Sequence, residues 1–269
     1  MSGSFRSSGL RVFSLIVIAA ALPVACRAQA ALLETDAIVV PEKVDRASDS
    51  SLVRANIAGV LATLSSIAMK EKISRFAGAS GASRKLDSFE AEVSIADGVE
   101  QYTSVRGHHR IFHHVSEIGG LWSFGEIVTM LRTTRDIIDS SATRGEEDAD
   151  AHPTIRFQGT SADHLWFVTV KGRIYWLDFE GTIRISRGTG EIERLTWACD
   201  SGPPETGIAS IVWDVNFRAD SIAGNAFTIP SDSIFRVVRT GLDQPAEWNL
   251  TQYLALGRYG SRVNVRYEP

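Results

Sequence analysis

Residues 172–217 read GRIYWLDFEGTIRISRGTGEIERLTWACDSGPPETGIASIVWDVNF. Within this stretch, β-branched and aromatic residues form four short runs, separated by turns rich in Gly, Pro and Asp. The runs are 174–177, 182–185, 192–197 and 208–217. Parallel neighbours would need crossovers of about a dozen residues or more, and all of these turns are shorter. The stretch therefore predicts consecutive antiparallel strands.

The same pattern continues on both sides of this stretch. Further strands are predicted at 89–95, 99–105, 155–157, 165–170, 227–229, 234–238 and 249–254. Asp97-Gly98 is a strong hairpin signal between the first two of them. Two amphipathic helices are expected, one following the N-cap residues 49–51 and one at 123–134. The predicted fold class is mainly β, of the α+β type, with a curved antiparallel sheet or half-barrel packed on two or three helices.

Side-chain alternation indicates which face of the sheet is buried. Trp213, Val215 and Phe217 are expected to face one way, with polar residues between them facing the other. The run LWFVTV at 165–170 differs, because it is bulky on both faces. Such a strand has to be covered twice, by helices on one side and by the opposite wall of a curved sheet or a ligand on the other.

The N-terminus predicts export. Arg6 and Arg11 precede an apolar run at 12–22, and Ala28-Gln29-Ala30 forms a small-x-small cleavage site, which together indicate a secretory signal peptide. A lipoprotein signal ending at Cys26 is the alternative, although Pro23 stands where such signals usually carry leucine. The predicted organisation is a signal peptide at 1–30, a flexible arm at 31–48 and a single β-rich domain at 49–269. The expected location is the periplasm or the exterior, within the cell envelope.

Charge and cysteine content narrow the function classes. Removal of the leader with its three arginines would leave 25 basic and 32 acidic residues, a net charge of −7. No basic stripe interleaved with aromatic residues is present, so we do not expect a nucleic-acid partner. Cys199 would be the single cysteine of the mature chain, which excludes an intramolecular disulfide. Nothing in the composition indicates a cofactor.

Four of the six histidines lie in the run GHHRIFHH at 107–114. On a strand, His108 and His114 would share one face and His109 and His113 the other, and two ligands are too few for a zinc site even with Glu117 nearby. On a helix, His109 and His113 would form an i, i+4 pair, but the HExxH pattern is absent. We interpret the run as a solvated segment, with adventitious metal binding as the alternative and no committed metal site.

Other catalytic patterns are weak. GASGAS at 78–83 lacks the GxSxG spacing of a nucleophile elbow, and GTGE at 188–191 has no phosphate-binding lysine. Cys199 has no predicted base beside it and is interpreted as a small buried hydrophobe. Four acids at strand ends could in principle form a carboxylate pair for glycoside hydrolysis, but acids in such positions usually face solvent. These acids are Asp178, Asp200, Glu205 and Asp214.

Trp166, Trp176, Trp197 and Trp213 all lie in the strand-rich half. Core packing is one interpretation of these side chains, and lining of an apolar ligand groove is the other. The residues expected to bind such a ligand are Trp166, Trp176, Trp197, Trp213 and Phe217.

The stretch 172–217, with its Pro203-Pro204 turn, resembles a family of uncharacterised secreted proteins of acidobacterial type. The resemblance extends to 64–76 and 250–260, although Met69 stands where that family often has a cysteine. The broader architecture is similar to the LolA-type lipoprotein-carrier half-barrel. The resemblance implies an open antiparallel sheet that wraps around helices and leaves an apolar concavity for acyl chains.

We expect a non-enzymatic secreted or envelope protein that binds an apolar or lipid-like ligand in a concave sheet. A lipid or a lipoprotein is the expected partner, with peripheral membrane association. The alternatives are a secreted hydrolase with an unrecognised site and a purely structural envelope domain. The carrier expectation depends on one premise, which is that apolar side chains outnumber those that two helices can shelter.

Overall fold

A computed structural model of the chain describes residues 46–78, 82–107, 110–113, 117–118, 127–141, 143–144, 153–186, 189–222, 225–241 and 246–258. The predicted signal peptide and residues 31–45 of the predicted arm lie outside the described residues. Helix α1 (Arg46–Leu64) begins within the segment assigned to the arm, one turn before the expected N-cap residues.

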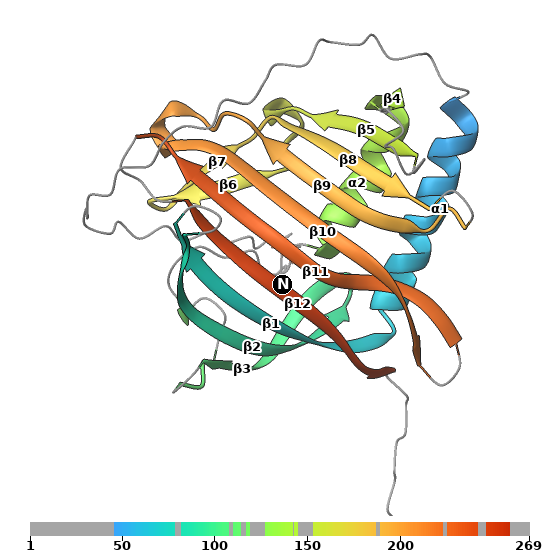
Figure 1. The fold of residues 1–269 in the computed structure, drawn as a ribbon. Coiled ribbons are helices and arrows are strands. Elements are labelled where there is room, and N and C mark those ends of the chain that lie inside the picture. Colours follow the sequence, from blue (N-terminus) through green and yellow to red (C-terminus); the bar gives the residue numbers. More distant parts are fainter. Residues whose placement is uncertain are drawn as a thin grey trace, which may run out of the picture.

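One ten-stranded antiparallel sheet dominates the structure (Figure 1). Its strands, in spatial order, are β3 (Val99–Gly107), β2 (Arg84–Ala96), β1 (Ile67–Ala77), β12 (Glu247–Arg258), β11 (Asn225–Arg239), β10 (Ile208–Ile222), β9 (Ile192–Cys199), β8 (Phe179–Ile185), β5 (Thr154–Gly159) and β4 (Thr143–Arg144). The sheet is curved, and α1 and α2 (Ile127–Ser141) pack on the same side of it (Figure 1). The predicted fold class is confirmed.

The curved sheet has an inner face, toward the helices, and an outer face. Helix α1 packs beside α2 and approaches β11 and β9, whereas α2 approaches β3 and β5, which lie near opposite edges of the sheet. The predicted alternation is confirmed, because Trp213, Val215 and Phe217 of β10 are buried on the inner face. Among the described residues, neither helix combines the length and apolar character needed to cross a membrane.

The run LWFVTV does not join the large sheet. Strand β6 (Phe167–Val170) pairs only with β7 (Arg173–Trp176), and this two-stranded hairpin lies over the inner face. Trp166, which precedes β6, contacts the rings of Phe179 and Trp197 on that face at centroid distances of 5.7 and 5.5 Å. The large sheet therefore covers one side of the hairpin, and the hairpin forms part of the cover over the inner face.

Two turns have the backbone that their sequence predicts. Asp97 and Gly98 both have positive φ, 52° and 72°, as a two-residue type I′ hairpin requires, and they connect β2 to β3. The Pro-Pro turn continues into a short 3-10 helix, η3 (Pro204–Thr206), before β10. A second 3-10 helix, η2 (Ser161–Asp163), lies between β5 and β6.

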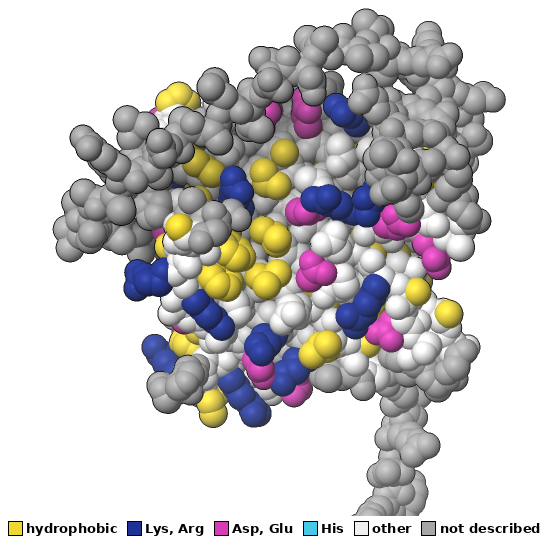
Figure 2. Space-filling view, viewed as in Figure 1, with side chains coloured by type: hydrophobic (Ala, Val, Ile, Leu, Met, Phe, Trp, Pro, Cys, Tyr) yellow, Lys and Arg dark blue, Asp and Glu magenta, His cyan; other side chains and the backbone are white. Residues whose placement is uncertain are grey.

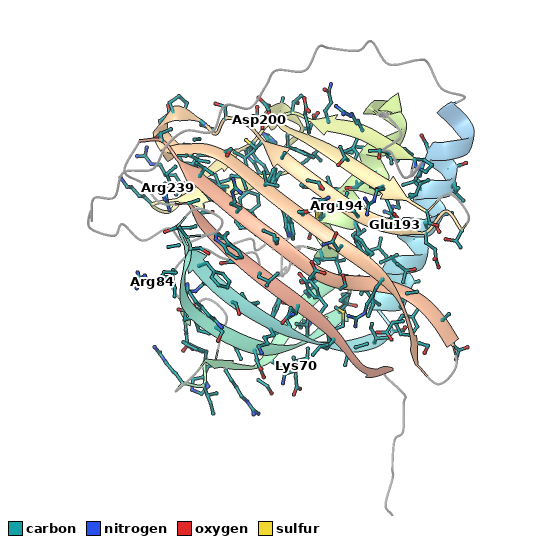
Figure 3. The ribbon with its side chains drawn as sticks, viewed as in Figure 1. Lys70, Arg84, Glu193, Arg194, Asp200 and Arg239 are labelled. Atoms are coloured by element: carbon teal, nitrogen blue, oxygen red, sulfur yellow. The ribbon has the colours of Figure 1, made fainter. Side chains whose placement is uncertain are left out.

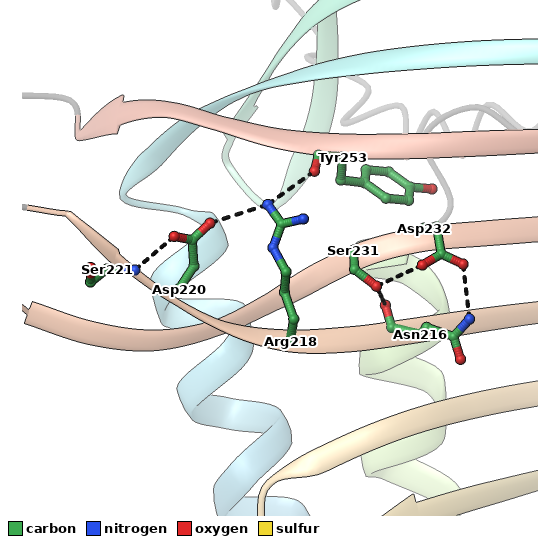
Figure 4. Close-up of polar contacts among 7 residues, drawn as sticks. All are labelled: Asn216, Arg218, Asp220, Ser221, Ser231, Asp232 and Tyr253. Atoms are coloured by element: carbon green, nitrogen blue, oxygen red, sulfur yellow. Dashed lines mark hydrogen bonds and ion pairs between the residues drawn. The ribbon is translucent and has the colours of Figure 1, made fainter.

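The two strands predicted at 227–229 and 234–238 are one strand, β11. Pro230 opposes Phe217 and Asp232 opposes Asn216, so Ser231 is the extra residue of a β-bulge, where a proline is tolerated. Polar contacts support the bulge (Figure 4): Asn216 Nδ2 donates to Asp232 Oδ1 at 2.8 Å, and Ser231 Oγ donates to Asp232 Oδ2 at 2.8 Å. The strand therefore continues through a residue that usually ends one.

The second helix extends further than predicted. It continues to Ser141, beyond the expected end at Thr134, because Ile138 follows Leu131 and Thr134 on the same buried stripe. Its predicted start at Ser123 lies outside the described residues.

Candidate functional site

The inner face carries a cluster of aromatic side chains from four strands and the hairpin. We define the aromatic cluster as Trp166, Phe179, Trp197, Trp213 and Phe235, all of them buried. Phe179 and Trp197 are stacked with ring centroids 4.4 Å apart, and Trp213 meets Phe235 edge to face at 6.2 Å. The register explains the proximity, because Trp197, Trp213 and Phe235 lie opposite one another on β9, β10 and β11.

Four of the five predicted ligand-binding residues share this face. Trp166, Trp197 and Trp213 belong to the aromatic cluster, and Phe217 is buried on the same side of β10. Trp176 is different, since it is half-buried on β7 and packs against Phe167 of the same hairpin at 5.0 Å. The structure brings four of these residues into one apolar core, and their role in ligand binding remains a prediction.

The indole N–H groups of the neighbouring Trp197 and Trp213 differ in their hydrogen bonding. Trp197 Nε1 donates a hydrogen bond of 3.1 Å to Thr134 Oγ1 of α2. Trp213 Nε1 is equally buried but has no hydrogen-bond partner among the described residues. Buried polar groups are almost always paired, so the Trp213 N–H is an exception.

A second cluster on the inner face is polar. We define the carboxylate cluster as Glu71, Glu100, Tyr102, Ser233 and Tyr253, which come from β1, β3, β11 and β12. Glu71 and Tyr253 are directly opposed across β1 and β12. The Tyr102 hydroxyl donates to Glu100 Oε2 at 2.8 Å, and the hydroxyls of Ser233 and Tyr253 are 2.9 Å apart.

Burial dominates the electrostatics of the carboxylate cluster. Burial raises the pKa of Glu71 well above its ordinary value of 4.5, and the negative charge of Glu100 raises it further, while a hydrogen bond with Tyr102 lowers it. Burial likewise raises the pKa of Tyr102 and of Tyr253, and the two carboxyl groups add to the effect. The tyrosines therefore remain protonated at neutral pH, and the protonated form of Glu71 is favoured.

Helix α2 is attached to the sheet by side-chain contacts at three points. Glu100 Oε1 accepts the backbone N–H of Val128 at 3.1 Å, one of the N–H groups that a first helical turn leaves unpaired. Arg132 Nη1 donates to the Gly98 carbonyl at 2.6 Å, and Thr134 accepts from Trp197. Each contact joins α2 to a different position on the sheet.

Sequence reasoning missed the carboxylate cluster, although one signal was available. Glu71 stands between Met69 and Ile73 in a strand, so strict alternation places it on the buried face. Glu100 gave no such signal, because Val99 beside it is the more apolar residue and yet is exposed. Glutamate is seldom buried, and ionisable groups in buried positions are often functional. Both positions are therefore candidates for a functional role.

The histidine run contributes little that the structure describes. His108, His109 and His114 lie outside the described residues. Glu117, considered as a zinc partner, is 3.6 Å from the guanidinium of Arg110. Within the described ranges, no group of three or more His, Cys, Asp or Glu residues could hold a metal ion.

Two of the four acids considered for a carboxylate pair, Asp178 and Asp214, have structural partners. Asp178 accepts the backbone N–H of Ser161 at 2.6 Å. Asp214 accepts hydrogen bonds from Arg194 Nε at 2.6 Å and from Thr196 at 2.9 Å. Cys199 is buried, and burial raises the pKa of its thiol, which disfavours the reactive thiolate.

A cleft of about 320 Å³ lies on the outer face above β5, β8 and β9. Its cationic residues are Arg184 and Arg194, and both are paired, with Glu193 at 3.2 Å and with Asp214. Figure 3 labels Arg194 and its neighbour Glu193 on β9. Figure 2 shows that acidic and basic side chains alternate over this face beside a group of hydrophobic ones. Since its charges are compensated within the protein, we regard the outer cleft as a weaker candidate than the inner face.

Comparison with known proteins gives no family. No family model matches the chain. No curated protein matches it either. Among solved structures, the chain is similar to a LolA superfamily protein from Nitrosomonas europaea, at a TM-score of 0.34 and 8% identity, over 76% of this chain and 91% of that one.

Proposed function

We propose that the protein binds a lipid-like, apolar ligand on the inner face of its sheet, and that α2 moves to admit it. The observation that carries this proposal is the way in which the aromatic cluster is covered. Its cover consists of helices and a hairpin outside the large sheet, and α2 bridges toward both sheet edges. A cover of this kind is separable without breaking any strand of the sheet.

A bound acyl chain would offset the apolar contacts that α2 gives up when it moves. Each of the three polar contacts of α2 contributes on the order of 1 kcal/mol to holding the helix in place. Burial of an acyl chain stabilises by about 0.8 kcal/mol per methylene group, so a chain of a dozen carbons supplies roughly 10 kcal/mol before the cost of association. The buried residues of α2, which include Met130 and Leu131, would then pack against the ligand.

The partners and location belong to the same proposal. The predicted signal peptide supports an envelope or secreted protein, and its ligand would be a membrane lipid or the acyl part of a lipoprotein. The hydrolase alternative finds less support, because Ser233 contacts the hydroxyl of Tyr253. The raised pKa of Tyr253 keeps that hydroxyl protonated at neutral pH, so it does not act as the base that a serine nucleophile needs.

Arg132→Ala tests α2 as the moving part. Loss of the bond to the Gly98 carbonyl makes opening easier by about 1 kcal/mol, so the apparent affinity for palmitoyl lysophosphatidylcholine should rise about five-fold. The measurement is displacement of an environment-sensitive dye, followed by recovery of the intact lipid.

Arg135→Ala is the matched control, on the same helix. Arg135 is paired with the adjacent Asp136 at 2.9 Å and forms no hydrogen bond or ion pair with the described residues of the sheet, so its loss should leave the affinity unchanged. No binding by the wild-type protein would refute the proposed function. Equal effects of the two substitutions would refute the role of α2, and release of free fatty acid would indicate a hydrolase.

A further inference from the structure

Two tryptophans on adjacent strands differ in a way that packing does not explain. Trp197 and Trp213 are directly opposed on β9 and β10, and are 1% and 2% exposed. Both rings belong to the aromatic cluster, and both make edge-to-face contacts with other rings. Only the N–H of Trp197 has an acceptor among the described residues, namely Thr134.

Among the described residues, the side chains beside Trp213 on β9 and β11 do not supply an acceptor. Ser233, the inner-face residue two positions before its cross-strand partner Phe235, bonds to Tyr253. Phe235 and Trp197, which flank Trp213, offer no acceptor atom to it. An indole N–H donates and never accepts, so whatever pairs with it has to bring an oxygen or a similar acceptor.

The surroundings restrict what that acceptor is. The N–H lies within an apolar core, where a charged phosphate or ammonium group would lose its hydration. A neutral carbonyl oxygen loses much less hydration free energy on burial, and one hydrogen bond offsets that loss. The carbonyl group of an acyl ligand lies at the end of an apolar chain. This arrangement matches a site in which a single N–H donor is surrounded by aromatic side chains.

We infer that Trp213 Nε1 donates a hydrogen bond to the acyl carbonyl oxygen of the bound ligand. This inference rests on the proposed function and specifies its ligand class, an ester-linked acyl chain in place of a simple hydrocarbon. The aromatic cluster supplies the apolar contacts along the chain, and Trp213 fixes the position of the carbonyl.

The test compares two lipids that differ only at the carbonyl. Palmitoyl lysophosphatidylcholine carries an ester carbonyl, and hexadecyl lysophosphatidylcholine has an ether in its place. The wild-type protein should bind the ester about five-fold more tightly, equivalent to about 1 kcal/mol. Trp213→Phe should abolish this preference by weakening ester binding alone.

Trp197→Phe is the matched control, because its N–H is committed to α2. This substitution should change the affinity for both lipids by the same factor and leave the ester preference intact. A wild-type protein that binds both lipids equally, or a Trp213→Phe variant that retains the preference, overturns the inference and leaves the proposed function standing. Failure of the wild type to bind either lipid overturns both.

A second readout needs no variant. In a nitrogen–proton correlation spectrum of the wild-type protein, the indole resonance of Trp213 should move downfield with the ester and not with the ether. Identical positions with the two lipids overturn the inference, whatever the folding of the variants.

Discussion

Glu71 is a carboxyl group on the buried face of a strand, with Glu100, Tyr102 and Tyr253 around it. Its folded-state pKa is raised, so the folded protein holds a proton that the unfolded chain releases near pH 4.5. The stabilisation from this proton is complete below that pH and is lost as the pH rises through the folded-state pKa.

Glu71→Gln should therefore remove part of the pH dependence of stability. Between pH 4.5 and neutrality the free energy of unfolding of the wild type should fall as Glu71 opposes ionisation, and the variant should lack this decline. The variant should consequently be the more stable protein at neutral pH. Urea denaturation at a series of pH values measures both effects.

Glu90→Gln is the control with the opposite sign. Glu90 lies on β2, where its bond to Lys70 at 2.7 Å lowers its pKa, so its stabilisation is present at neutral pH and lost on acidification. This variant should be slightly less stable than the wild type at neutral pH. A Glu71→Gln protein that is also destabilised at neutral pH would contradict the assigned protonation of Glu71.

At the scale of the elements, two glycines allow the sheet to accommodate its aromatic residues. Gly181 of β8 opposes Phe157 of β5, and Gly159 of β5 opposes Phe179 of β8. A Cβ atom at Gly181 would lie 2.1 Å from the ring of Phe157, and one at Gly159 would lie 2.4 Å from the ring of Phe179. Each ring covers the glycine opposite it.

Gly181→Ala should destabilise the protein by about 1–3 kcal/mol, because the added methyl group forces the Phe157 ring out of its position. Gly59→Ala is the matched control within α1. A Cβ atom there meets nothing within 4 Å, and alanine favours a helix by up to about 1 kcal/mol, so this variant should be more stable. Thermal or urea denaturation measures both changes in the free energy of unfolding. Changes of the same sign in the two variants would contradict the assigned packing.

The strands and the pairing of strands that follow one another closely in the sequence were predictable from local pattern, and the long-range pairings were not. Alternation in 208–217 identifies the buried face correctly, and Asp97-Gly98 identifies its hairpin. The separation of β6 and β7 from the large sheet depends on contacts with Trp197 and Phe179 that no local pattern encodes. The bulge at Pro230 concealed the continuity of β11, since a proline normally ends a strand.

The candidate site was predictable to a similar degree. Alternation places Trp213 and Phe217 on one face, as observed, and the strand register brings Trp197 to the same face. It does not reveal which indole N–H is paired, because Thr134 approaches Trp197 only through the packing of α2. Nor does it reveal the contact between Glu100 and the first turn of α2, since those residues are joined by tertiary structure alone.

At the scale of the whole molecule, the premise was that apolar side chains outnumber those that two helices can shelter, which predicted a pocket or a docked partner. On the described residues, the β6–β7 hairpin supplies additional cover instead. The inner face is sheltered by α1, α2 and the β6–β7 hairpin together, so the cover is more extensive than two helices. The carrier proposal consequently requires the cover to open, and it does not depend on a permanently hollow sheet. The carboxylate cluster lies beside the start of α2, where such an opening would break the contact between Glu100 and Val128.

Native mass spectrometry tests the central claim most directly. The protein would be purified gently from the producing cell, and a second sample would be offered palmitoyl lysophosphatidylcholine before measurement. The account predicts a species heavier than the polypeptide by the mass of one intact lipid in both samples. Detection of the bare polypeptide alone, in both samples, would contradict it.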